Sequence, residues 1–321
     1  MENKLKIALA QVAPVWLQKQ ATLEKAASCV LEAAKKGCQL IVFGEGFLPG
    51  YPFWLAHTEG AKFNSSFQKE LYAHYVEHAI QPELGDIDGL CALAKTHKIA
   101  IYLGAVEKAA NRGGHSLYCS LIYIDQKGQV KSVHRKLQPT YEERLVWAQG
   151  DGNGLVVHTL NDFTLGSLNC WENWMPTARA VLQAQGEDVH IALWPGNITN
   201  TQEITRHIAR EGRSFAVSVS SLMRRKDIPK ETPHYDTLMK HLPETMANGG
   251  SCVAAPDGNW LESPLVDIEG LICTTLNLRH VWEERQNFDP AGHYSRPDVI
   301  QLQVNRERQH SLIWKDGEIK N

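Results

Sequence analysis

The chain has 321 residues, of which 43% are hydrophobic and 21% are charged. This composition is typical of a folded globular protein and excludes disordered and collagen-like chains. The 33 basic and 36 acidic residues leave a formal net charge of −3, so no excess of positive charge is present to attract a nucleic-acid backbone.

The cellular setting is predicted from apolar runs and cysteines. No run approaches the roughly 18 apolar residues of a membrane span, and the N-terminus lacks a secretory pattern. The 7 cysteines are an odd number and are scattered without a C-x-x-C pair, which predicts free thiols in a reducing compartment. We therefore expect a cytoplasmic protein with no membrane contact.

Strands and helices alternate along the first half of the chain. A strand at 5–10, an amphipathic helix at 22–35 and a buried strand at 40–43 form a strand-helix-strand unit, because their hydrophobic periods change in that order. The elements predicted next are a helix at 85–97, a strand at 99–106, and a hairpin of strands at 117–125 and 129–135.

The second half repeats this alternation, without a linker or an internal repeat. Its predicted elements are strands at 163–168, 189–194 and 216–222, and helices at 176–186 and 201–215. The pattern predicts one α/β domain over residues 1–285, with an irregular tail at 286–321 that packs on the same domain or on an oligomer partner. Segments 50–81 and 223–248 interrupt the alternation and are candidate rims of a pocket.

Cys170 is the strongest candidate for a reactive group. It follows a predicted strand at a turn into a helix, where free backbone N–H groups favour a thiolate and later an oxyanion. An inert packed thiol is an equally good interpretation of this local pattern. Glu45 and Lys136 also end predicted strands. Each alone is more often a solvated charge, but reactive groups at three strand ends together indicate a site.

Two other sequence patterns are weaker evidence for a functional site. His74 and His78 are four residues apart on a possible helix, but they lack the glutamate of a zinc motif and a third ligand, so core or surface histidines are the better interpretation. Residues 150–154, Gly-Asp-Gly-Asn-Gly, resemble a phosphate loop only in composition and are interpreted as a turn.

Four segments in order resemble the nitrilase superfamily, and within it the nitrilase branch. They are Glu45 followed by Phe-Leu-Pro-Gly-Tyr-Pro, Arg135-Lys136-Leu137 with Pro139-Thr140-Tyr141 and Glu143-Arg144, Cys170-Trp171-Glu172 with Met175-Pro176, and 292–298, Gly-His-Tyr-Ser-Arg-Pro-Asp. The resemblance covers about residues 4–300. It implies a four-layer αββα sandwich, a Glu45-Lys136-Cys170 triad, a further carboxylate at Glu143, and a homo-oligomer, dimer or higher.

The chemistry fits these residue types. A thiol with a pKa of about 8.5 needs a base, which is the role expected of Glu45. The anion that develops on nitrogen needs a fixed cation, which is the role expected of Lys136 with the Trp171 N–H. We expect a nitrilase that converts a small-molecule nitrile to its carboxylic acid and ammonia, through a thioimidate and a thioester, without a metal or other cofactor.

Aromatic residues near these segments are candidates for substrate binding. They are Tyr51, Trp54, Trp171 and Trp194, and core packing is the alternative for each. Alternative functions are an amidase or carbamoylase and a cyanide-hydrolysing enzyme on the same triad, or a non-catalytic oligomeric scaffold. The scaffold is suggested by Gly44 and Gly46, which replace a common proline and a bulkier residue and could loosen Glu45.

Overall fold

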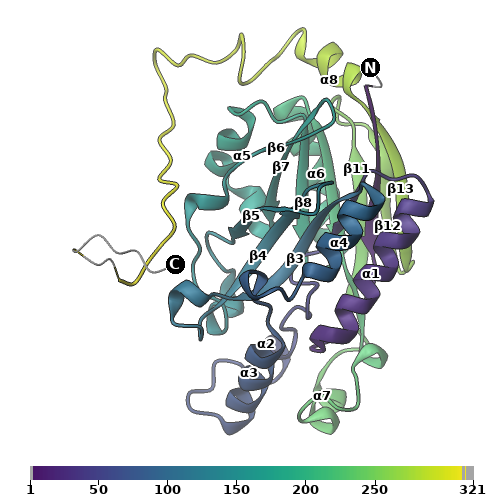
Figure 1. The fold of residues 1–321 in the computed structure, drawn as a ribbon. Coiled ribbons are helices and arrows are strands. Elements are labelled where there is room, and N and C mark those ends of the chain that lie inside the picture. Colours follow the sequence, from purple (N-terminus) through teal and green to yellow (C-terminus); the bar gives the residue numbers. More distant parts are fainter. Residues whose placement is uncertain (1–2, 313–314, 316–321) are drawn as a thin grey trace.

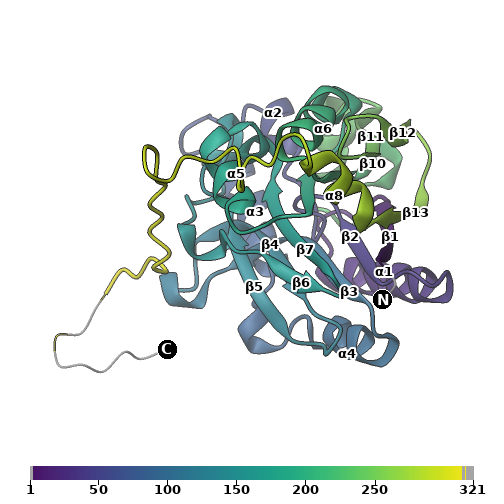
Figure 2. The same ribbon diagram turned by 90° about the horizontal axis from the view of Figure 1, so that it is seen from above.

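Two β-sheets face each other, and helices cover both outer faces (Figure 1 and Figure 2). The computed structural model describes residues 3–312 and 315. The predicted four-layer αββα sandwich is confirmed.

The first sheet has six strands in the order β13-β1-β2-β3-β4-β5. Its central strands β1, β2 and β3 are parallel, and β13, β4 and β5 add antiparallel edges. The strand bounds are β1 Lys4–Gln11, β2 Leu40–Phe43, β3 Ala100–Lys108, β4 Leu117–Ile124, β5 Val130–Arg135 and β13 Gly270–Asn277. All four residues of β2 are buried, as expected for a strand covered on both faces.

The second sheet has seven strands in the order β10-β11-β9-β8-β7-β6, with β12 paired to β11. Strands β7, β8 and β9 are parallel. The bounds are β6 His158–Leu160, β7 Phe163–Asn169, β8 Val189–Trp194, β9 Phe215–Ser220, β10 Leu222–Arg224, β11 Thr245–Ala254 and β12 Trp260–Val266. Apolar side chains of both sheets interlock between them and form the central core.

Helices complete the two outer layers. Helix α1 (Lys19–Lys35) and helix α4 (Asp88–His97) pack on the first sheet, whereas α5 (Pro176–Gln183) and α6 (Ile198–Gly212) pack on the second. Three small helices, α2 (Trp54–His57), α3 (Ser66–His78) and α7 (Tyr235–His241), lie together at one end of the body (Figure 1). No helix in the described part of the chain is long and apolar enough to cross a bilayer.

The structure differs from the predicted elements mainly at the interruptions. Segment 50–81 contains α2 and α3, the latter capped by the Ser65 hydroxyl, which accepts a hydrogen bond from the Gln68 N–H. Helix α6 begins at Ile198, earlier than predicted, because the Asn197 side chain accepts a hydrogen bond from the Thr199 N–H. Strands β11 to β13 were not predicted from the sequence, because polar residues and glycines dilute their alternation.

The last part of the chain is an arm. Helix α8 (Leu278–Arg285), which was not among the predicted elements, begins it, and no further helix or strand occurs between residues 286 and 312. Figures 1 and 2 show this yellow segment running along the outside of the body, away from α8.

Candidate active site

The structure brings Glu45, Lys136, Glu143 and Cys170 together between the two sheets. Glu45 follows β2 and Lys136 follows β5, so both come from the first sheet, whereas Cys170 follows β7 of the second. Glu143 lies in a 3₁₀ turn, η3 (Tyr141–Leu145). The four residues are between 0% and 3% exposed, so their charges interact with little screening by water.

Lys136 lies between two carboxylates. Its Nζ is 2.8 Å from Glu45 Oε1 and 2.7 Å from Glu143 Oε2. Burial disfavours the ammonium, but the charges of Glu45, Cys170 and Glu143 outweigh burial and hold the pKa of Lys136 well above its usual value. The site therefore contains a permanent cation.

Glu45 has one occupied and one free oxygen. Its Oε1 also accepts a hydrogen bond from the thiol of Cys119 at 3.5 Å, whereas its buried Oε2 has no hydrogen-bond partner among the described residues. Burial raises the pKa of Glu45 to about 7, opposed by the charge of Lys136 and assisted by that of Glu143. The free oxygen, Oε2, can therefore accept a proton near neutral pH.

The glycines on either side of Glu45 have structural reasons. A Cβ on Gly44 would lie 2.6 Å from Ser221 Oγ and 2.9 Å from the Trp194 carbonyl oxygen, so no side chain fits there. The Glu45 N–H donates to that same Trp194 carbonyl at 3.0 Å. Gly46 has a φ of 57°, in the left-handed region that favours glycine. These departures from the family pattern accompany a firmly held glutamate.

Cys170 is the first residue of a 3₁₀ turn, η5 (Cys170–Trp174), and has a φ of 46°. A left-handed backbone at a residue other than glycine, aspartate or asparagine is strained, and such strain gathers at functional sites. Burial and the charge of Glu45 raise the pKa of the thiol, whereas Lys136 and the Trp171 N–H lower it. The resting thiol keeps its proton until a base removes it.

The same cluster has donors of the kind that bind metals. Donor atoms of Glu45, Glu143 and Cys170 lie within 4.8 Å of one another. The ammonium of Lys136 contacts both carboxylates and fills the position that a cation would take between them. The donor set is therefore already neutralised in part by a side chain.

Glu172 is a residue that the sequence analysis did not assign to the site. Its buried carboxylate accepts hydrogen bonds from the Leu137 N–H at 2.6 Å and the Asn169 N–H at 2.8 Å, and it lies 3.1 Å from His134 Nε2. Burial opposes ionisation, but His134 and the two backbone donors lower the pKa of Glu172. One anion thus ties the residue after Lys136 to the residue before Cys170. The sequence signal that could have indicated this role is the position of Glu172, two residues after Cys170.

Tyr51 is the aromatic residue that reaches the polar cluster directly. Its hydroxyl donates to Glu143 Oε1 at 2.8 Å, and its ring packs edge-on against Trp147 at 5.5 Å between centroids. The Trp147 ring in turn lies 5.8 Å from Lys136 Nζ, a cation–π contact.

The other aromatic candidates lie in three different settings. Trp194 is buried and packs in the cluster that contains Cys170, with its Nε1–H donating to Ser218 Oγ. Trp171 is 52% exposed and packs beside Trp174. Trp54 packs among core aromatic residues and lines a pocket of about 210 Å³ with Leu145.

The histidine pair and the glycine-rich segment, which were the weaker sequence patterns, have structural roles. His74 Nε2 lies 3.0 Å from the Leu17 carbonyl oxygen, and His78 Nδ1 accepts a hydrogen bond from the Lys19 N–H, so both histidines fasten α3 to the chain around α1. Residues 150–154 contain a short 3₁₀ turn at 152–154, capped by the Asp151 side chain.

Comparison with known proteins identifies the family and the relatives of this chain. Residues 6–286 match the carbon-nitrogen hydrolase family model. The chain is 36% identical to nitrilase 2 of Arabidopsis thaliana over 302 residues, which cover 92% of this chain and 87% of the relative. It is 32% identical to an aliphatic nitrilase of Rhodococcus rhodochrous, over 95% of this chain and 83% of the relative.

Solved structures support the fold. A carbon-nitrogen hydrolase from Helicobacter pylori superposes with a TM-score of 0.66 at 18% identity, over 92% of this chain and 97% of that one. The family match spans most of the sequence, and the nitrilase relatives align along nearly its whole length. This chain belongs to the carbon-nitrogen hydrolase family, in its nitrilase branch, as its motifs had indicated.

Proposed function

We propose that this enzyme is a nitrilase that uses Cys170 to hydrolyse an organic nitrile to the carboxylic acid and ammonia. The observation that carries the proposal is a thiol beside a carboxylate whose pKa is about 7 and an ammonium that burial does not neutralise. This combination supplies a nucleophile, a base and a fixed positive charge in one buried space.

In the first step the sulfur of Cys170 attacks the nitrile carbon. Its proton passes to Glu45 Oε2 and then to the nitrile nitrogen, so that the product is a neutral thioimidate. The ammonium of Lys136 and the Trp171 N–H stabilise the negative charge that develops on nitrogen, because both donors are already in place before the reaction.

The remaining steps consume two water molecules. Glu45 removes a proton from the first water as it adds to the thioimidate carbon, and the resulting tetrahedral intermediate expels ammonia to leave a thioester. A second water, activated in the same way, releases the carboxylic acid and returns the thiol. Glu143 orients Lys136 through its 2.7 Å contact, and the Tyr51 hydroxyl and the Thr140 N–H orient Glu143.

We propose that the organic group of the nitrile contacts Tyr51, Trp171 and Trp194, and that Trp54 forms the outer wall of the substrate pocket. Tyr51 has the strongest support, because it bonds to Glu143. Amide hydrolysis is the second candidate, since the Lys136 ammonium would stabilise an oxyanion as well as a nitrogen anion.

The test is a panel of aliphatic and aromatic nitriles, their amides and cyanide, with ammonia, acid and amide measured separately. We expect acid and ammonia from nitriles, and loss of turnover in Cys170→Ala. The matched control is Cys91→Ala, which removes a half-buried thiol in α4 and keeps full turnover. Turnover that survives Cys170→Ala contradicts the mechanism, and faster amide turnover favours the amidase.

The wider setting is also proposed. We place the catalytic domain at residues 1–285 and the tail at 286–321, of which 313–314 and 316–321 lie outside the described residues. A cytoplasmic location is supported by the 7 free thiols. A homo-oligomer is supported by exposed apolar residues of the arm, Val299, Ile300 and Leu302, which a second copy would cover.

A further inference from the structure

The glycine-rich loop at 150–154 lies directly against the end of β5. The Gly150 N–H donates to the Lys136 carbonyl at 2.8 Å, and a Cβ on Gly150 would overlap the main chain there. A Cβ on Gly154 would overlap His134 in the same way. The glycines therefore allow this loop to lie against the backbone that presents Lys136.

The other side of the loop contacts the C-terminal arm. A Cβ on Gly152 would overlap the Asn305 carbonyl oxygen. The Asn153 side chain donates to the Arg306 carbonyl at 3.0 Å. The loop is thus enclosed between β5 and residues 305–309. We name residues 305–309 the arm clamp.

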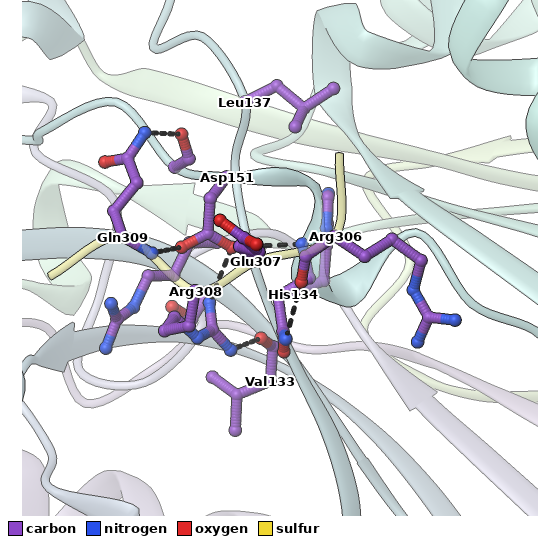
Figure 3. A network of polar contacts seen from close by, with 12 residues as sticks. Val133, His134, Leu137, Asp151, Arg306, Glu307, Arg308 and Gln309 are labelled. Carbon is purple, nitrogen blue, oxygen red and sulfur yellow. Dashed lines mark hydrogen bonds and ion pairs between the residues drawn. The ribbon is translucent and has the colours of Figure 1, made fainter. Parts of the chain in front are cut away.

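Asp151 is the anchor of the arm clamp, as Figure 3 shows. Asp151 is only 7% exposed. Its carboxylate accepts hydrogen bonds from Arg308 Nη1 at 3.0 Å and from the Gln309 N–H at 3.0 Å. The second Arg308 nitrogen, Nη2, donates to the Val133 carbonyl of β5 at 2.7 Å. One guanidinium therefore joins the loop to the catalytic strand.

Gln309 adds a link that leads toward the site. Its Nε2 donates to the Gly150 carbonyl at 3.2 Å, while the N–H of the same glycine holds the Lys136 carbonyl. Two hydrogen bonds through Gly150 thus connect the arm to the main chain of Lys136.

We propose that the arm clamp positions Lys136, with Arg308 and Gln309 as positioning residues for catalysis. The inference rests on the proposed role of Lys136 in the reaction. Lys136 Nζ contacts two carboxylates at 2.8 and 2.7 Å, so a shift of its main chain disturbs the position of the ammonium between them. Misplacement by about 1 Å at a preorganised site costs up to roughly 100-fold in rate.

The decisive variant is Arg308→Ala in the full chain, compared with Arg285→Ala. Arg285 is a matched control because it is also a partly buried arginine, paired with Asp188 and bonded to the Glu187 carbonyl. It lies at the end of α8, at the start of the arm. Both variants should lower the Tm, because each loses a charged hydrogen-bonded contact.

Only Arg308→Ala should lower kcat, by about tenfold, with KM within about threefold of the wild type. Alkylation of Cys170 by iodoacetamide should slow in parallel, because a displaced ammonium no longer favours the thiolate. Arg306→Ala, in an exposed side chain that points away from Asp151 in Figure 3, should change neither quantity.

A milder variant covers the case in which Arg308→Ala does not fold. Gln309→Ala keeps the Arg308–Asp151 pair and should lower kcat about threefold. The proposal is overturned if folded Arg308→Ala or Gln309→Ala keeps the wild-type kcat and alkylation rate, or if Arg285→Ala loses as much of both. Lack of nitrile turnover by the wild type would instead count against the proposed function, because the alkylation comparison needs no substrate.

Discussion

Two neighbouring basic residues at the end of β5 are both buried and both paired with carboxylates, but in different ways. Arg135 meets Glu107 through two contacts, Nε to Oε2 at 2.9 Å and Nη2 to Oε1 at 2.6 Å, and Ser120 also donates to Oε2. Every oxygen of Glu107 is therefore hydrogen-bonded. The carboxylate of this structural ion pair is thus fully hydrogen-bonded, although the buried Arg135 Nη1 has no partner among the described residues.

Lys136 is surrounded by more negative charge than it can neutralise. It meets Glu45 and Glu143 together, and the excess leaves Glu45 with a pKa of about 7 and with a buried oxygen that has no partner in the described chain. The comparison teaches that an ion pair whose carboxylate keeps a free oxygen and a raised pKa is the one suited to chemistry.

The strongest test of this difference substitutes each of the two basic residues in a separate variant. Lys136→Gln should lower kcat about 1000-fold, because it removes the cation and raises the pKa of Glu45 further. Arg135→Lys keeps the charge but loses the two-point contact, so it should lower the Tm while kcat changes by less than about threefold. Ammonia release and circular dichroism melts measure both. Equal losses of kcat would remove the distinction.

Glu172 sharpens the comparison, because it is fully hydrogen-bonded like Glu107 but joins two catalytic segments. Glu172→Gln places an amide donor against the N–H of Leu137 or Asn169 and should lower kcat by about 10- to 100-fold with little change in KM.

The control for this variant is Glu269→Gln, since Glu269 also accepts hydrogen bonds from one backbone N–H and one lysine. It lies between β12 and β13 rather than beside the site. An unchanged kcat in folded Glu172→Gln would make that residue a purely structural one.

The smallest expected effect is a shift of the pH profile when Glu143 is substituted. Glu45 must be ionised to act as a base, so kcat/KM should fall about tenfold per pH unit as the pH drops below about 7. The charge of Glu143 raises the pKa of Glu45, so Glu143→Gln should move this limb of the profile to lower pH. The pH dependence of Cys170 alkylation gives an independent measure. A limb that stays in place, with kcat intact, would argue against any role for Glu143.

Much of the fold was predictable because it depends on local periodicity. The strand before Glu45 is a short apolar run, the strand before Cys170 contains spaced apolar residues, and the strand before Lys136 is the second strand of a hairpin. The ends of such strands are where α/β folds place reactive groups. The approach of three such ends across two sheets was not predictable from periodicity, and it came from the family resemblance instead.

Other features depend on contacts between distant segments. Nothing near Gly44 in the sequence indicates that Ser221 occupies the space of a side chain, and nothing near Asp151 indicates Arg308. Strands β11 to β13 were missed for a similar reason, because pairing with neighbours rather than alternation stabilises them.

The active site joins two sheets, and this has a consequence for how the protein folds. Glu45 and Lys136 follow strands of one sheet and Cys170 follows a strand of the other, with the central core between them. Each sheet formed alone carries only part of the chemistry. Recovery of thiol reactivity during refolding should therefore lag behind secondary structure and report the moment when the two layers dock in register.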